Sequence, residues 1–130
     1  MQMAKTIFLV FSALMFSVFA YLQINDAAQY GNFDAWSWVL LYGITALLSL
    51  LLLRLRLNAA ILHIWLGFAV GSLYFHIQDD TGNFHFDRLD LFHLWNAQGE
   101  MIQQTNEAGG LLFIVLGTLA FVAINRARVQ

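Results

Sequence analysis

Long apolar stretches separated by shorter polar ones dominate the pattern of this chain. Four stretches are recognisable, at residues 6–24, 36–53, 59–77 and 108–125. Each is close to the ~20 residues that an α-helix needs to cross a hydrocarbon core. Backbone groups in lipid must find partners within their own segment, and these stretches lack the alternation of membrane β-strands. The pattern predicts an all-α, four-helix transmembrane bundle that forms a single integral membrane domain over residues 1–130.

The polar connection before the fourth stretch is the longest, and it contains a second kind of periodicity. Over residues 86–97, hydrophobic side chains alternate with charged and polar ones. This spacing predicts a short amphipathic helix that lies in the membrane interface between the third and fourth spans. Aromatic residues near the span ends on the same side fit an aromatic belt. They are Tyr21, Trp36, Trp38, Tyr74 and Trp95.

Composition supports the interpretation as a membrane protein and excludes several kinds of functional site. Hydrophobic residues make up 60% of the chain and charged residues only 11%, whereas about 25% are charged in ordinary soluble domains. A soluble domain of this size would leave much of that apolar surface in water. The absence of cysteine excludes disulfides, thiol catalysis and iron–sulfur sites, and no basic run suggests nucleic acid as a partner.

The distribution of charge predicts the orientation of the spans. Basic residues gather on the side that holds both termini and the turn between the second and third spans, and Arg88 alone lies opposite. The gathered residues are Lys5, Arg54, Arg56, Arg126 and Arg128. By the positive-inside rule, both termini are expected in the cytoplasm, with the acidic residues outside. The compact chain, which lacks Cys and Pro, suggests the inner membrane of a bacterial cell.

The first apolar stretch has an alternative interpretation. Lys5 followed by an apolar run and by Val18-Phe19-Ala20 resembles a secretory signal peptide with its cleavage site. The run is long for a signal peptide, so we favour a membrane span. Cleavage would leave the orientation of the other spans unchanged.

Three residues of the third span share one helix face. His63, Gly67 and Gly71 are spaced four apart, and a pair of glycines at this spacing lets another helix approach closely. We favour helix packing as their role. His63 could instead relay protons or bind a ligand, as ionisable groups within membranes often do.

The outer connection gathers three of the four histidines together with several carboxylates. His76 lies three and four residues before two aspartates, so the pair would face one ligand if the helix continued that far. Imidazole and carboxylate together suit zinc, copper, iron or manganese. The alternative is a solvated acidic loop with incidental histidines. The candidate ligands of a divalent metal are His76, Asp79, Asp80, His85, Asp87 and His93.

Polar residues also mark the outer ends of the first and fourth spans. Asn25 and Asp26 end the first span, and Glu107 begins the fourth, where an acid in the first turn would be stabilised by the helix dipole. Because these ends share one membrane depth, they could instead form a ligand-binding pocket with aromatic walls. Its candidate residues are Asn25, Asp26, Trp38, Tyr42, Glu107 and Gly110.

Three short motifs resemble the transmembrane protein 220 family. Residues 21–26 (Tyr-Leu-Gln-Ile-Asn-Asp) are similar to the Gln-x-Asn-Asp signature that ends its first helix. Residues 38–44 resemble its Trp-x-x-x-Tyr opening of the second helix, and residues 107–111 its Glu-x-x-Gly-Leu motif. The chain departs from the family where Ala27-Ala28 stand in place of Pro-Asp. The resemblance implies a fold and outer-face key residues, but no reaction.

Two functional hypotheses follow. The first is an accessory or scaffold subunit that packs against itself or against a larger membrane complex through small-residue faces. The alternative is an outer-face ligand- or metal-binding protein, or an enzyme, that uses Asp26, Glu107 and the loop histidines. Transport has less support because no charge lies at mid-depth in a span and no helix is broken. No catalytic triad is recognisable, so the sequence leaves open whether the chain is an enzyme.

Overall fold

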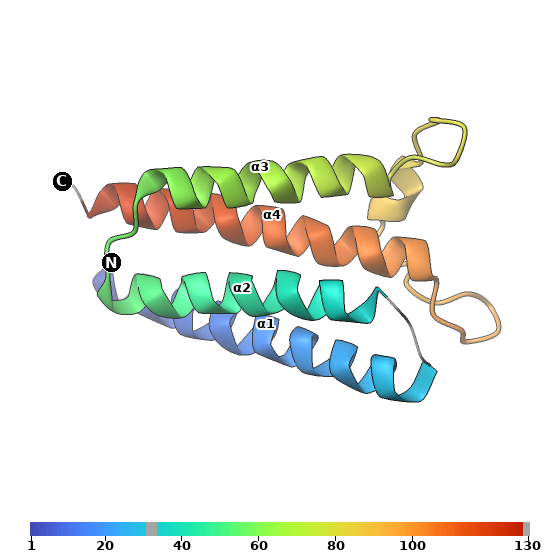
Figure 1. The fold of residues 1–130 in the computed structure, drawn as a ribbon, viewed down its shortest axis with the longest axis horizontal. Helices are drawn as coiled ribbons and strands as arrows, with labels where there is room; N and C mark the ends of the chain where they lie inside the picture. Colours follow the sequence, from blue (N-terminus) through green and yellow to red (C-terminus); the bar gives the residue numbers. More distant parts are fainter. Residues whose placement is uncertain (31–33, 129–130) are drawn as a thin grey trace. The chain divides into compact units, whose positions relative to one another are not determined.

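The computed structural model describes the backbone of residues 1–30 and 34–128, and the side chains of residues 1–25 and 34–128. Its main elements are α1 (Gln2–Tyr30), α2 (Ala35–Arg54), α3 (Ala59–His76), the short 3-10 helix η1 (Phe86–Leu89) and α4 (Gln103–Ala127) (Figure 1). All four α-helices are long and apolar enough to span a membrane. Within the described residues the only β-type pairings are two isolated bridges, and the all-α prediction is confirmed.

The helices α1 and α4 extend beyond their apolar stretches. α1 begins at Gln2, and α4 begins at Gln103, five residues before the predicted span. Hydropathy marks the part of a helix that suits lipid, whereas backbone hydrogen bonding continues into polar flanks. This extension matters for Glu107, which lies beyond the first turn of α4.

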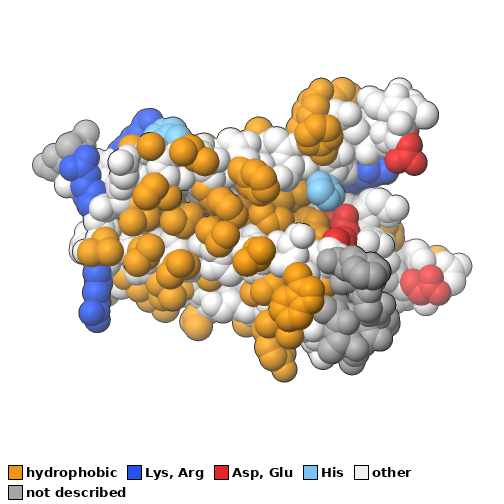
Figure 2. All heavy atoms as spheres, viewed as in Figure 1, with side chains coloured by type: hydrophobic (Ala, Val, Ile, Leu, Met, Phe, Trp, Pro, Cys, Tyr) orange, Lys and Arg blue, Asp and Glu red, His pale blue; other side chains and the backbone are white. Residues whose placement is uncertain are grey.

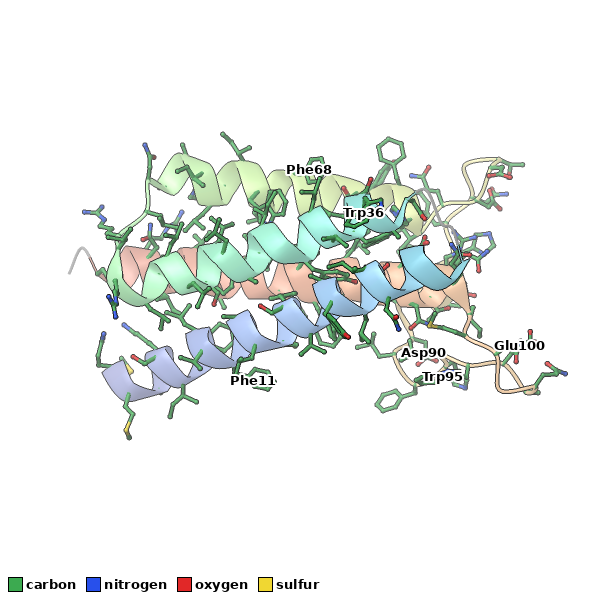
Figure 3. The ribbon with its side chains drawn as sticks, turned by 60° about the horizontal axis from the view of Figure 1, so that its bottom comes forward. Phe11, Trp36, Phe68, Asp90, Trp95 and Glu100 are labelled. Carbon is green, nitrogen blue, oxygen red and sulfur yellow. The ribbon has the colours of Figure 1, made fainter. Side chains whose placement is uncertain are left out.

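The chain divides into two compact units, of which the first comprises residues 1–59 and 121–130. Here α1 packs against α2 (Figure 1). The buried residues Leu9, Ser12, Ala13 and Phe16 recur on one face of α1 at the helical period. Ser49 on α2 donates a hydrogen bond of 2.7 Å to the carbonyl oxygen of Leu9. Outward-pointing side chains such as Phe11 (Figure 3) leave the opposite face of α1 apolar and exposed, which suits lipid.

The basic residues of the first unit gather at one end of it, as Figure 2 shows. Arg54 lies in the last turn of α2 and Arg126 in the last turn of α4, where cations are favoured by the helix dipole. Arg128 donates hydrogen bonds to the carbonyl oxygens of Leu52 and Leu55, at the point where α2 ends.

The second unit, residues 60–120, contains two copies of one turn. In the first copy, the carboxylate of Asp79 accepts hydrogen bonds from the backbone N–H groups of Thr81 and Asn83. In the second copy, the side-chain oxygen of Asn96 accepts the equivalent bonds from residues 98 and 100. Each turn has a glycine with positive φ three residues after the Asx residue, Gly82 and Gly99, and each is closed by an isolated β-bridge. The pair forms two hairpins of the bulged three-residue type.

The predicted amphipathic helix over residues 86–97 is present only as η1, and its extent was therefore wrong. The helix ends at Leu89, and the side chain of the next residue, Asp90, accepts a hydrogen bond of 3.0 Å from the N–H of Phe92. An Asx turn of this kind offers the backbone an alternative to the helix. Asn96 then starts the second hairpin. Local hydrogen bonds from side chain to backbone thus override the periodicity of the apolar residues.

Candidate functional site

The polar contact that joins the two spanning helices of the second unit is between His76 and Glu107. Nε2 of His76, the last residue of α3, lies 3.6 Å from Oε2 of Glu107, and both side chains are half-buried. Nδ1 of His76 donates to the carbonyl oxygen of Ser72 at 2.8 Å, and Gln103 donates to Oε1 of Glu107 at 2.9 Å. The arrangement places an imidazole nitrogen beside a carboxylate, two groups that can together bind a polar ligand or a metal ion.

This pairing corrects two expectations. α3 ends at His76, so the helix does not continue to bring this side chain onto one face with Asp79 and Asp80. Glu107 is not in the first turn of its helix, because α4 begins at Gln103. Its position is explained by contacts with Gln103 and His76 rather than by the helix dipole, whose influence is largest in the first turn.

His85 joins the first turn through Asp79. Nε2 of His85 donates to Oδ2 of Asp79 at 2.8 Å, while Nδ1 lies 3.7 Å from Oδ1 of Asp87. The hydrogen bond from His85, followed by those from the Thr81 hydroxyl and the Asn83 backbone, holds the pKa of Asp79 well below its usual range. This carboxylate is already saturated with donors from its own turn.

His93 pairs with a different carboxylate. Its Nδ1 lies 2.5 Å from Oδ2 of Asp90, on an exposed part of the loop (Figure 3 labels Asp90). The hydrogen bond from the N–H of Phe92, followed by the one from His93, lowers the pKa of Asp90. His76, His85 and His93 thus each face a separate acidic partner.

The predicted metal ligands are accordingly distributed over several pairs. His85 is brought together with Asp79 and Asp87, whereas His76 and His93 are placed elsewhere and Asp80 is exposed. Among the residues whose side chains the structure describes, no group of three or more His, Asp or Glu residues is placed to hold a metal ion. The divalent metal site stays a prediction.

The predicted ligand-binding residues fall in both units. In the first unit, Trp38 and Tyr42 are buried. The ring of Tyr42 is stacked on Phe16 at a centroid distance of 6.3 Å and is tilted against Trp38 at 5.9 Å. These aromatic rings fill the space between α1 and α2. Asn25 is exposed in the C-terminal part of α1, and the side chain of Asp26 lies outside the described residues.

In the second unit, the glycines that follow Glu107 have a packing role. Gly109 and Gly110 are buried, and a Cβ atom at Gly109 would come within 3.0 Å of Cδ2 of Leu91. The missing side chain therefore lets the loop residue Leu91 pack directly on α4. The convergence of Glu107 and Gly110 with the first-unit residues into one pocket stays a prediction.

The glycine face of α3 points away from the packed side of that helix. Leu62 and Ala69 are its buried residues, and at 3.6 residues per turn they lie on the side opposite Gly67. Gly67 is exposed, Gly71 is half-buried, and a Cβ atom at either would have no neighbour within 4 Å. His63, one turn before Gly67, is likewise exposed. The face is open for a partner outside this helix pair.

Sequence reasoning missed two residues that organise the loop. Nη1 of Arg88 donates to the carbonyl oxygens of His76 and Gln78, at 2.9 and 2.8 Å, and so caps the end of α3. Asn96 shapes the second turn. The sequence does contain a signal for this turn, because Asp79-x-x-Gly82 and Asn96-x-x-Gly99 have the same spacing. No local signal indicated the partners of Arg88.

Comparison with known proteins gives one match. A family model described as "Transmembrane family 220, helix" matches residues 15–123, which is most of the chain. The resemblance drawn from the three short motifs is thereby confirmed. Neither the curated proteins nor the solved structures contain a match to this chain.

Proposed function

The chain belongs to transmembrane family 220, and we propose that it is an accessory subunit of a membrane complex that acts by lateral association through the glycine face of α3. This face comprises His63, Gly67 and Gly71. The observation that supports the proposal is the empty space beside the two glycines, on the side of α3 opposite its buried residues. In lipid, helices associate where small residues let their backbones approach closely.

The proposed membrane is the inner membrane of a bacterial cell, with both termini in the cytoplasm. Five of the six basic residues support this orientation under the positive-inside rule. Single cysteines at Arg56 and Thr81 test it, since the chain has no cysteine of its own. A membrane-impermeant maleimide added to intact spheroplasts should label the Thr81→Cys protein and not the Arg56→Cys protein; the reverse pattern would contradict the orientation.

Association is tested by replacing both glycines with leucine. Purified in mild detergent, the wild-type protein should run as a dimer or co-purify with a membrane partner. The Gly67→Leu/Gly71→Leu protein should lose that partner, because the added side chains separate the helices by several ångströms. Gly43→Leu in α2 is the matched control, since Gly43 also has no neighbour within 4 Å of a Cβ atom. A monomeric wild-type protein without a stable partner would refute the proposal.

A second candidate function is ligand binding at the outer face through His76 and Glu107. The observation in its favour is the orientation of His76, whose Nδ1 is engaged by Ser72 so that Nε2 faces the carboxylate. Zinc and manganese serve as probes, because imidazole and carboxylate are their usual ligands. Thermal stabilisation by either ion that is lost in Glu107→Gln and retained in the exposed Glu100→Gln would support this function. Equal melting with and without ions in all three proteins would oppose its metal form.

A further inference from the structure

Three aromatic rings continue the surface of α3 beyond the end of the helix. Tyr74 lies in the last turn of α3, and its ring centroid is 5.4 Å from that of Phe84. Phe84 in turn stacks on Phe86 of η1, at 5.7 Å and an interplanar angle of 13°. We refer to these three residues as the aromatic ladder. Hydrophobic side chains are visible at this end of α3 in Figure 2.

The ladder is exposed over much of its area. Tyr74, Phe84 and Phe86 are 53%, 46% and 67% exposed, and Phe75 beside them is 73% exposed. Single exposed apolar residues are ordinary on a protein surface, but a contiguous apolar patch marks an interaction site. This patch is continuous with the surface of a helix that is apolar enough to span a membrane. When α3 spans a membrane, the end of its apolar surface is expected at the boundary between lipid tails and headgroups.

The ladder is also held in place relative to α3. Arg88 bonds the carbonyl oxygens of His76 and Gln78, and the N–H of His85 donates to the carbonyl oxygen of Ile77 at 2.6 Å. The bridge between Gln78 and Phe84 closes the first turn. These bonds fix the backbone positions of Phe84 and Phe86 relative to the end of α3.

Several polar residues of the same segment lie at the tip of the first turn, whereas Asp87, whose side chain is 83% exposed, directly follows Phe86. Asp80, Thr81, Gly82 and Asn83 form the exposed tip of the first turn, beyond Phe84. The segment thus separates an aromatic side next to α3 from a hydrophilic tip. Tyr favours the membrane–water interface because its ring is apolar and its hydroxyl is polar, and Phe occurs on the apolar face of segments that lie in this interface.

We propose that the aromatic ladder lies among the outer lipid headgroups and anchors the segment 77–89 to the membrane surface, with the tip of the first turn in water. The occupant of the exposed aromatic surface is lipid. The anchor differs from the predicted helix over residues 86–97, because it is built from the end of α3, a hairpin and one turn of η1. It is independent of the association proposed for Gly67 and Gly71.

The experiment places single spin labels on the cysteine-free chain. Phe86→Cys and Phe84→Cys report on the ladder, Thr81→Cys on the tip, and Leu47→Cys in α2 provides a reference inside a span. Each purified protein is reconstituted into vesicles of phosphatidylcholine and phosphatidylglycerol. Collision rates are then measured with oxygen, which concentrates in lipid, and with a nickel chelate, which stays in water.

The ladder labels should collide more often with oxygen than with the chelate. This preference for oxygen should be strongest at Leu47 and weaker at Phe84 and Phe86. The label at Thr81 should instead collide more often with the chelate. Ladder labels as open to the chelate as the Thr81 label would overturn the proposal and would indicate a surface kept for a protein partner. Two ladder positions are used so that failure of one variant to insert leaves the other as a readout.

Discussion

The side-chain amide of Asn125 makes two hydrogen bonds to the backbone of Leu57. Oδ1 accepts from the N–H of Leu57 at 3.0 Å, and Nδ2 donates to its carbonyl oxygen at 2.8 Å. Leu57 belongs to the short extended turn between α2 and α3, which has no helical partners for its backbone. A buried amide near the end of α4 thus supplies the pairing that a neighbouring strand would otherwise provide.

Asn125→Ala should destabilise the protein more than a surface substitution does. Removal of the amide leaves the N–H and carbonyl groups of Leu57 without partners, at a cost of about 1–3 kcal/mol for such a group. Thermal unfolding in detergent, followed by circular dichroism, measures the effect. Gln104→Ala is the control because Gln104 is exposed in the same helix. Identical melting temperatures for the two variants would contradict the role of Asn125.

Acid should loosen the first turn of the loop between α3 and α4 and leave the second turn unchanged. The pKa of Asp79 is lowered in the folded state, mainly by the hydrogen bond from His85. The stability that the Asp79 carboxylate contributes to the fold is therefore complete above the ordinary pKa of about 3.9. This contribution is lost as the pH falls towards and through the lower pKa of the folded state. Asn96, which organises the second turn, does not titrate.

Amide exchange distinguishes the two turns. The N–H groups of Thr81 and Asn83 should lose protection below pH ~4, after correction for the intrinsic pH dependence of exchange, while those of Gln98 and Glu100 keep theirs. Asp79→Asn should remove the acid response of the first turn. Equal loss of protection in both turns would show that Asp79 is not its source.

Alanine at either turn glycine should open the corresponding hairpin. Gly82 and Gly99 have φ values of +85° and +77°, a left-handed conformation that costs residues with a Cβ atom about 1–2 kcal/mol. Limited proteolysis of the loop should become faster in Gly82→Ala and Gly99→Ala. Gly43→Ala, in the helical backbone of α2, should be cleaved at the wild-type rate. Unchanged proteolysis in both turn variants would argue against these backbone conformations.

Arg88→Met should release the segment after α3. Methionine keeps the length of the side chain but cannot donate to the carbonyl oxygens of His76 and Gln78, and hydrogen bonds from charged donors contribute about 1.5–3 kcal/mol. Exchange of the His85 N–H, which is bonded to Ile77, should accelerate. The exposed Arg56 is replaced by Met as the control. An unchanged rate at His85 would show that the cap does not hold the segment.

Much of the fold was predictable because lipid imposes a simple requirement. Each span needs an apolar run of sufficient length with internal hydrogen bonds, and the four helices satisfy it. The extent of the loop helix was not predictable from the same periodicity. Asp90 and Asn96 bind nearby backbone groups there, and such local bonds leave the apolar pattern unchanged while they end the helix.

The candidate site was predictable in its components but not in its pairings. From the sequence, Glu107 was expected in a ligand pocket and His76 in a metal site, and the alternative function grouped Glu107 with the loop histidines as a set. The structure pairs Glu107 with His76 in particular. Trp38 and Tyr42 were expected to line a pocket, whereas within their unit they pack with Phe16. Residue type indicates which chemistry a side chain can perform, but its neighbour across the fold depends on where each helix begins and ends.

The sequence by itself determined that four helices suit a membrane and where the charges lie along the chain, because each of these depends on segments of fewer than about 25 residues. Only the tertiary structure decided that Asn125 would serve the backbone of Leu57, 68 residues away, and that Arg88 would cap α3. The sequence around a hydrogen-bond donor or acceptor does not indicate which distant group will be its partner. The packing of whole helices brings such groups within 3 Å of one another.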